Sequence, residues 1–167
     1  ALEQLMQAYF FSFRETASGL QAMLRDGTVD TSVTASDCIE QNTGSQLVPF
    51  VLSRTEDLVL PAQMEVQSLN RLKQYETQVQ RAARATTAAT DTASLRLSLV
   101  LSEPHAEAIA TTQLADRWAE RSTLSLELPM RYAALECGDV ITLSDGVATH
   151  TLRLTRVQIG KPGKLRL

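Results

Sequence analysis

An α+β fold, mostly antiparallel β with one long helix between strands, is predicted for this chain from three observations. Leucines occupy every second position from Leu95 to Leu101 and again from Leu124 to Leu128, the period of a strand. Between these segments, apolar residues recur every three or four positions from Ala106 to Trp118, the period of a helix. The chain has 7 glycines and 5 prolines, which fall at the ends of the expected elements, so these elements should be regular.

The composition is that of an ordinary globular protein. The 167 residues, 44% hydrophobic and 21% charged, suffice for one domain or two small lobes with a buried core. A net charge of -3 argues against wholesale coating of nucleic acid. The longest apolar run, Leu47 to Leu52, is far short of the roughly 20 residues that a membrane helix needs, so no membrane insertion is expected. Because the sequence begins at Ala1 without a Met or a signal peptide, we expect a piece of a longer chain.

Residues 1–60 are expected to form a smaller N-terminal α+β lobe. Apolar spacing favours a helix from Leu2 to Phe10, and a short helical turn capped by Ser36 and Asp37 is expected through Glu40. Strands are expected over Phe11–Thr16, Leu20–Arg25, Thr31–Thr34 and Leu47–Arg54. Turns or loops are expected at 17–19, 26–27 and 42–45. Pro49 predicts an edge position or a bulge in the last strand.

The stretch from Gln63 to Ser94 combines a strand pattern with a helical pattern. Gln63–Leu69 alternates as a half-buried strand, with Met64, Val66 and Ser68 on one side. The first half of Arg71–Ser94 has apolar residues at helical spacing, namely Leu72, Tyr75, Val79 and Ala82. Because Ala85–Ser94 has no apolar face, we expect a long exposed excursion with a helix in its first half.

The residues after Leu101 carry clearer sequence signals for helices, strands and turns than the preceding stretch does. Ser102 and Pro104 are typical of a helix start, and the helix is expected to run from Pro104 to about Arg121. Its buried face is predicted to contain Ala106, Ile109, Ala110, Leu114 and Trp118. Further strands are expected over Leu124–Leu128, Val140–Leu143, Val147–Val157 and Lys164–Leu167, with a hairpin turn at Ser144-Asp145-Gly146.

Motif searches predict no catalytic, cofactor-binding or metal-binding residue. The chain has two cysteines, Cys38 and Cys137, and two histidines, His105 and His150. No CxxC, HExxH, GxSxG, GxGxxG or GxxxxGK[ST] pattern occurs. No cofactor is expected.

For the remaining candidate catalytic and metal-binding residues, a structural role is favoured over a functional one. Cys137 with His105 or His150 is one candidate for nucleophile and base, but a cysteine in Glu-Cys-Gly-Asp ahead of a strand is typical of a turn. The acids at 136, 139 and 145 match no calcium-loop spacing, and those at 120 and 127 have no reason to converge as a glycosidase pair.

A basic segment lies inside the expected excursion. Its cations are Arg71, Lys73, Arg81 and Arg84. Since Glu76 lies among them, a solvated arm is favoured over a DNA-binding patch, and DNA contact is not expected. The preferred interpretation is an arm that reaches a neighbouring subunit, with a floppy loop as the alternative.

The order of segments in the second half carries a family resemblance. The run SEPHAEAIATTQLADRW, then LSLELPMRY and AALECGDVITLSDG, resembles the tail hub domain of long-tailed bacteriophages and gene transfer agents. That family has an Ala-rich helix with a tryptophan-bearing end, an alternating strand, Pro-x-Arg-Tyr and Leu-Glu-Pro-Gly-Asp-Val-Val. The corresponding stretches here are Ala106–Trp118, Thr123–Leu128, Pro129–Tyr132 and Leu135–Val140. Cys137 replaces the family's proline, and Thr28–Leu60 matches least well.

The resemblance implies a structural role. It implies a β-barrel-like hub lobe over 61–167, with helix 104–121, and an inserted lobe over 1–60, whose opening ALEQLMQAYFFSFRE resembles that of the family. In that family the hub forms a ring, usually a trimer, that joins the tail tube to host-contacting tail proteins, so the resemblance implies that the partners of this chain are other copies of itself and other tail proteins. The expected location is the virion tail, after synthesis in the host cytoplasm.

Two alternatives belong to other functional classes. The first is a host-surface or cell-wall carbohydrate-binding module, which needs exposed aromatic residues. The chain has one Trp, three Tyr and four Phe, several at positions expected in the core. The second is a cell-wall hydrolase, for which the motif searches find no catalytic residues.

Overall fold

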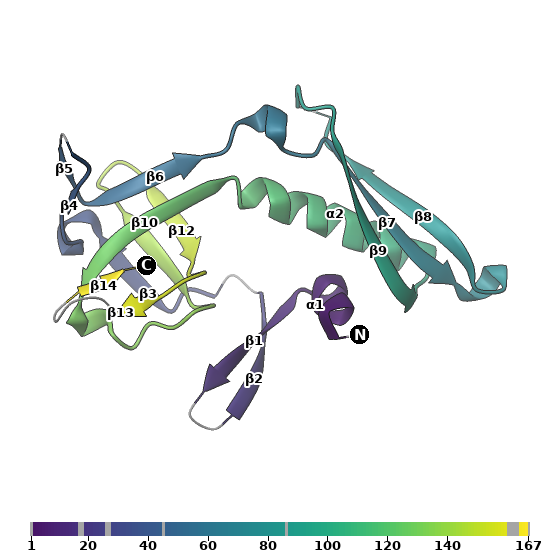
Figure 1. Ribbon diagram of the computed structural model, residues 1–167, viewed down its shortest axis with the longest axis horizontal. Coiled ribbons are helices and arrows are strands. Elements are labelled where there is room, and N and C mark those ends of the chain that lie inside the picture. The colour runs from purple at the N-terminus through teal and green to yellow at the C-terminus, as the bar shows by residue number, and fades with distance from the viewer. Residues whose placement is uncertain are drawn as a thin grey trace. The chain divides into compact units, whose positions relative to one another are not determined.

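The computed structural model describes residues 2–16, 19–25, 28–44, 46–85, 87–159 and 164–166 (Figure 1). The chain forms two compact units, each made of two separated stretches. Unit 1 comprises Ala1–Phe10 and Arg54–Thr123, and unit 2 comprises Phe11–Ser53 and Leu124–Leu167. The predicted α+β class is confirmed. These two compact units divide the chain differently from the predicted lobes 1–60 and 61–167. The division into an inserted lobe and a hub lobe at residue 60 stays a prediction.

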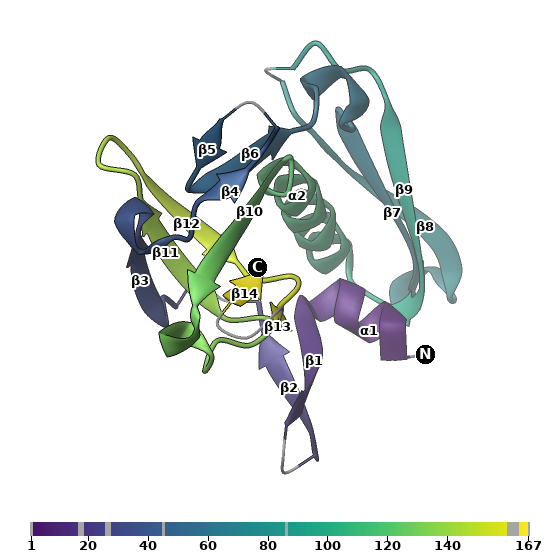
Figure 2. The same cartoon turned by 60° about the vertical axis from the view of Figure 1, so that its left-hand side comes forward.

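Unit 1 is a three-stranded sheet covered by a long helix (Figure 2). Its strands are β7 (Gln63–Asn70), β8 (Glu76–Ala83) and β9 (Thr92–Val100), in the order β8-β7-β9. β7 pairs antiparallel with β8 and parallel with β9. The helix α2 (Glu103–Ala119) packs against β7 and β8, while α1 (Leu2–Tyr9) contacts β9.

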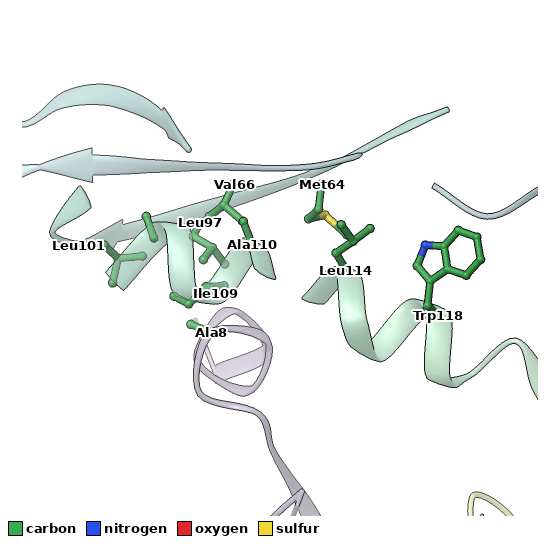
Figure 3. Packing of buried hydrophobic residues seen from close by; sticks show 10 residues of the cluster. Ala8, Met64, Val66, Leu97, Leu101, Ile109, Ala110, Leu114 and Trp118 are labelled. Atoms are coloured by element: carbon green, nitrogen blue, oxygen red, sulfur yellow. The ribbon is translucent and has the colours of Figure 1, made fainter. Parts of the chain in front are cut away.

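The core of unit 1 is built from residues that alternate along β7 and residues that recur every three or four positions along α2. Burial alternates along β7 as predicted, with Met64, Val66 and Ser68 inside. The buried residues of α2 are those predicted, Ala106, Ile109, Ala110, Leu114 and Trp118. Figure 3 shows how the β7 side chains meet α2. Trp118 is a core anchor, as predicted, and its indole Nε1 donates to the Pro61 carbonyl at 2.9 Å.

The helix predicted in the first half of Arg71–Ser94 is wrong. Residues Arg71–Lys73 form one 3-10 turn, and Glu76–Ala83 is the edge strand β8. Strand β9 already begins at Thr92, so the last residues of the expected excursion belong to the sheet. The sequence did not indicate a strand here because the inward face of β8 carries polar and small residues, namely Gln78, Gln80 and Ala82. These residues give no alternation of apolar and polar side chains, which is the usual signal of a strand.

The remaining strands are short and belong to unit 2, apart from residues 54, 122 and 123 at the ends of two of them, which belong to unit 1. They are β1 (Phe11–Thr16), β2 (Gly19–Leu24), β3 (Thr31–Thr34), β4 (Gln41–Asn42), β5 (Leu47–Val48), β6 (Phe50–Arg54), β10 (Ser122–Pro129), β11 (Val140–Ser144), β12 (Thr149–Arg153), β13 (Gln158–Ile159) and β14 (Lys164–Arg166). The sheets have the orders β13-β14-β10-β6 and β12-β11-β3, with separate hairpins β1-β2 and β4-β5. Pro49 divides the predicted strand 47–54 into β5 and β6.

The core of unit 2 lies between its two larger sheets. It joins Leu126 and Leu128 of β10 to Val33 of β3 and to Ile141 and Leu143 of β11. β3 pairs with β11 in parallel, whereas antiparallel pairing predominates elsewhere, as predicted. Among the described residues no closed barrel is formed, so the barrel-like lobe stays a prediction.

The remaining local predictions have mixed outcomes. The short helical turn predicted through Glu40 is a 3-10 turn at Ala35–Asp37. Thr34, not Ser36, precedes it, and the Asp37 carboxylate accepts from the Thr34 hydroxyl at 2.7 Å and from its amide at 3.1 Å. The hairpin turn after Ser144 is confirmed by the bond from the Asp145 amide to the Ala148 carbonyl. The predicted turn positions 17–18, 26–27 and 45 lie outside the described residues.

Candidate assembly surface

The loop that joins β7 to β8 is held by its own backbone and by one side chain. Asn70 Oδ1 accepts from the Leu72 amide at 2.9 Å, and the Tyr75 amide donates to the Asn70 carbonyl at 2.8 Å. Gln74 and Tyr75 have φ values of 54° and 64°. Left-handed backbone is costly for bulky residues, on the order of 1–3 kcal/mol each, and such strain concentrates at functional sites.

A buried polar network fixes the base of this loop. Gln78 Nε2 donates to Ser68 Oγ at 3.1 Å and to the Leu101 carbonyl at 2.9 Å. Asn70 Nδ2 donates to Gln78 Oε1 at 2.7 Å. All three of these polar side chains are buried. The network therefore joins β7, β8 and the residue that follows β9 into one rigid end of the sheet.

Beside the loop lies a groove of about 680 Å³ between residues 70–73 and 100–104. Lys73 Nζ and Glu103 Oε1 form an ion pair across it at 2.8 Å. The hydrogen bond to the Glu103 carboxylate is the main cause that raises the pKa of Lys73 above its ordinary value. Glu103 is the one acid that lines the groove. The groove therefore has no second carboxylate for acid–base chemistry.

Large apolar side chains are exposed in this loop and in the strands beside it, and two of them, Leu72 and Val100, line the groove. Leu72 is 93% exposed and Tyr75 is 57% exposed, and Val79 of β8 and Val100 of β9 are also exposed. We call these four residues the apolar tip. The sequence pattern had placed Leu72, Tyr75 and Val79 on one side of a helix. Exposed apolar groups clustered in this way are typical of protein-binding surfaces.

Three of the four cations in this segment make contacts within unit 1. Besides the lysine that pairs across the groove, Arg81 Nε lies 2.8 Å from Glu65, and the Arg84 guanidinium stacks 4.4 Å from the Trp118 ring centre. Arg71 is exposed and has no ion-pair partner among the described residues. The segment is therefore an ordered hairpin with one free cation and an apolar end.

In unit 2, the Pro-Met-Arg-Tyr segment connects two turns. Arg131 forms an ion pair with Asp37 and lies 5.1 Å from the Tyr132 ring centre. Tyr132 is partly buried and packs against the core of unit 2. Bonds from Thr34, followed by the charge of Arg131, lower the pKa of Asp37. The motif is a structural clamp between residues far apart in the sequence.

The Glu-Cys-Gly-Asp segment is also a structural turn. Gly138 has φ of 99°, which favours glycine. The Asp139 carboxylate fixes the turn by accepting from the Glu136 amide at 2.9 Å. Its other oxygen pairs with Arg14 Nη1 of β1 at 2.9 Å. The Met23 side chain of β2 lies 3.0 Å from the position of a Cβ on Gly138. The hairpin β1-β2 is therefore attached to unit 2 through this turn.

The structure brings the cysteines and histidines into no catalytic pair among the described residues. Cys137 is exposed. His150 Nε2 lies 3.7 Å from Asp145, and the ring of His105 packs on that of Tyr9 at 5.6 Å between centres.

The candidate acids have structural contacts. Those weighed as calcium ligands are Glu136, Asp139 and Asp145. The first two pair with Arg14, and the third accepts from its own turn backbone. In the described ranges no group of three potential metal ligands occurs. Glu120 is exposed at the end of α2, and Glu127 lies half-buried on β10. The part of the chain that the structure describes contains no helix long and apolar enough to span a membrane.

Comparison with protein families identifies the kind of protein. A model of a family described as putative phage tail protein matches residues 1–157. The chain belongs to this family. The predicted recognition as a phage tail structural protein, not an enzyme, is thereby confirmed, as is its location in the virion tail. No curated protein matches the tail protein significantly.

Solved structures share its fold. The tail protein is similar to a chain in the virion of a native gene transfer agent particle, with a TM-score of 0.88 and 23% identity over 99% of this chain. It is also similar to a tail protein from Neisseria meningitidis MC58 (TM-score 0.61, 13% identity, 95% covered) and to a 43 kDa tail protein of prophage MuSo2 from Shewanella oneidensis (TM-score 0.61, 8% identity, 99% covered). The tail protein spans 36%, 51% and 48% of the lengths of these three chains.

Proposed function

We propose that this chain is a hub domain of a tail tip, and that copies of it form a ring, usually of three, between the tail tube and the host-contacting parts. The observation that carries the proposal is the near-complete likeness to a chain of a gene transfer agent virion, at a TM-score of 0.88. In this proposal residues 61–167 supply the barrel-like lobe of the hub, and residues 1–60 supply its inserted lobe. Since the tail protein spans 36% of that neighbour, further domains of a parent chain would supply other parts of the tip.

The chemistry of the described residues supports an assembly role. The buried polar side chains near the groove, Asn70 and Gln78, hold the loop between β7 and β8. The Pro-Met-Arg-Tyr and Glu-Cys-Gly-Asp segments also have structural roles, the first through an ion pair and the second as a turn. In contrast, the apolar tip consists of side chains that gain free energy when a partner covers them, about 25 cal/mol for each Å² of apolar surface. A ring component needs such surfaces, whereas a hydrolase needs converging acids or a nucleophile.

Imaging of tail particles tests the proposal. Particles that carry this chain with a small epitope at the exposed Val147 turn are labelled with an antibody fragment and averaged by electron microscopy. We expect label in a ring at the tip, on three-fold related positions. Label along the tube, or none on intact particles, would overturn the proposal.

A binding assay tests the carbohydrate-binding alternative. Tyr9 and Tyr75 are the exposed large aromatic side chains of the described residues. If the chain bound cell-wall polysaccharide and Tyr75→Ala abolished that binding, a host-surface module would be favoured over the hub.

A further inference from the structure

We propose that the apolar tip of unit 1 in one copy packs on an apolar face of the β1-β2 hairpin in unit 2 of the next copy. This inference rests on the proposed ring, and it names the two surfaces that would meet. The hairpin face consists of Phe11, Phe13, Leu20, Ala22 and Leu24.

The pairing register places these five residues on one side of the hairpin. Phe11 lies opposite Leu24, and Phe13 lies opposite Ala22. Directly opposed residues of an antiparallel pair project from the same face, and Leu20 continues the alternation. The two phenylalanine rings meet edge to face at 5.4 Å between centres. Leu20 and Leu24 are 68% and 71% exposed, so much of this face is open.

The opposite face of the hairpin is already used. It carries Arg14, which pairs with Asp139, and Met23, which reaches Gly138. These contacts hold the hairpin on unit 2 in one orientation, so its apolar face is presented outward from the turn. A two-stranded hairpin alone is at best marginally stable in water. A partner that covers its open face would supply the burial that the isolated hairpin lacks.

The apolar tip is shaped in advance for such a contact. The left-handed Gln74 and Tyr75 and the network around Gln78 hold Leu72 and Tyr75 outward, so little ordering entropy is lost when a partner binds. Tyrosine is also enriched among the residues that dominate interface energies.

Charge complementarity favours the hairpin face as the partner. Arg71, beside the apolar tip, is exposed and has no ion-pair partner among the described residues. Glu15 lies opposite Leu20 on the hairpin face, is exposed, and also has no ion-pair partner there. A tip-to-tip contact would instead bring two Arg71 side chains together. Two different surfaces on one chain that recognise each other form a head-to-tail contact, and such contacts generate a ring when the rotation from copy to copy closes, as the proposed ring requires.

Disulfide trapping in purified tail particles tests the contact. Cys38→Ser and Cys137→Ser remove the native thiols, and Leu72→Cys with Leu20→Cys places one thiol on each surface. After oxidation, denaturing gels without reductant should show a ladder of covalent multimers whose longest species gives the copy number of the ring. Each single cysteine variant should stay monomeric. Leu72→Cys combined with Val147→Cys, which is exposed outside the hairpin, is the matched control.

Three results would overturn the inference. They are no ladder in particles that contain the ring, dimers from Leu72→Cys alone, or a link within one chain. Absence of a ring from the imaged particles would instead reject the proposed function.

A charge exchange gives a second measurement if the cysteine variants fail to assemble. Arg71→Glu should reduce the yield of particles with rings by roughly tenfold, equivalent to about 1.4 kcal/mol. Glu15→Arg in the same chain should restore most of that yield. If the double variant assembles no better than the worse single variant, the two residues do not meet.

Discussion

Replacing Gln78 by alanine should destabilise unit 1 by about 3 kcal/mol. Gln78 is 5% exposed, and its amide joins Ser68, Asn70 and the Leu101 carbonyl through bonds of 3.1, 2.7 and 2.9 Å. A typical intramolecular hydrogen bond contributes about 0.5–1.5 kcal/mol net, and a buried group left unsatisfied costs about 1–3 kcal/mol. Three lost bonds at about 1 kcal/mol each give the expected value.

The strand itself supplies the matched control. Gln80 lies two residues further along the same face of β8, is half-buried, and makes no side-chain hydrogen bond to the described residues. Gln80→Ala therefore has the same effect on strand propensity and removes similar volume without breaking the network. The difference between Gln78→Ala and Gln80→Ala isolates the hydrogen bonds.

The fluorescence of Trp118 allows the unfolding of unit 1 to be followed selectively. It is the single tryptophan of the chain and lies in the core of unit 1, so its fluorescence during urea denaturation reports on this unit. We expect Gln78→Ala to lower the denaturation midpoint clearly and Gln80→Ala to lower it little. If the two variants fell within about 0.5 kcal/mol of each other, the network would not hold the loop and the reasoning would be refuted.

Other predictions concern single contacts. Trp118→Phe removes the bond to the Pro61 carbonyl and should cost about 1–2 kcal/mol by urea denaturation followed by circular dichroism; no loss would show that the bond is not needed. Gly138→Ala should lower the thermal midpoint, because φ of 99° is strained for alanine and its Cβ would meet Met23 at 3.0 Å; an unchanged midpoint would contradict this. Bonds from backbone amides lower the pKa of Asp145 below its ordinary 3.8, so its stabilisation is present above pH 3.8 and is lost as the pH falls through the folded value. Asp145→Asn keeps an acceptor oxygen but cannot titrate, and should therefore lose less stability between pH 4 and pH 2 than the parent; equal acid sensitivity would refute the assignment.

The sequence determined the elements whose burial has a clear period. The alternation around Met64 and Val66, and the face of α2 that contains Ala110 and Trp118, were predicted residue by residue. This works because side chains alternate along a strand and recur every three or four positions on a helix, so burial against one core leaves a direct trace in the sequence. The roles of Gly138 and Asp139 were also predictable, since a tight turn restricts the residues that fit it.

Only the tertiary structure decided the pairing of distant segments and the character of β8. Parallel pairing of β3 with β11 joins residues more than a hundred positions apart, and nothing local specifies it. β8 was mistaken for a helix because its inward face includes Gln78, which is buried through hydrogen bonds that exist only after Ser68, Asn70 and Leu101 have come together. A polar residue can be buried when its partners are in place, and those partners come from other elements of the fold. The apolar tip could likewise be identified only from the tertiary structure, because the exposure of a leucine side chain depends on which other elements pack against it.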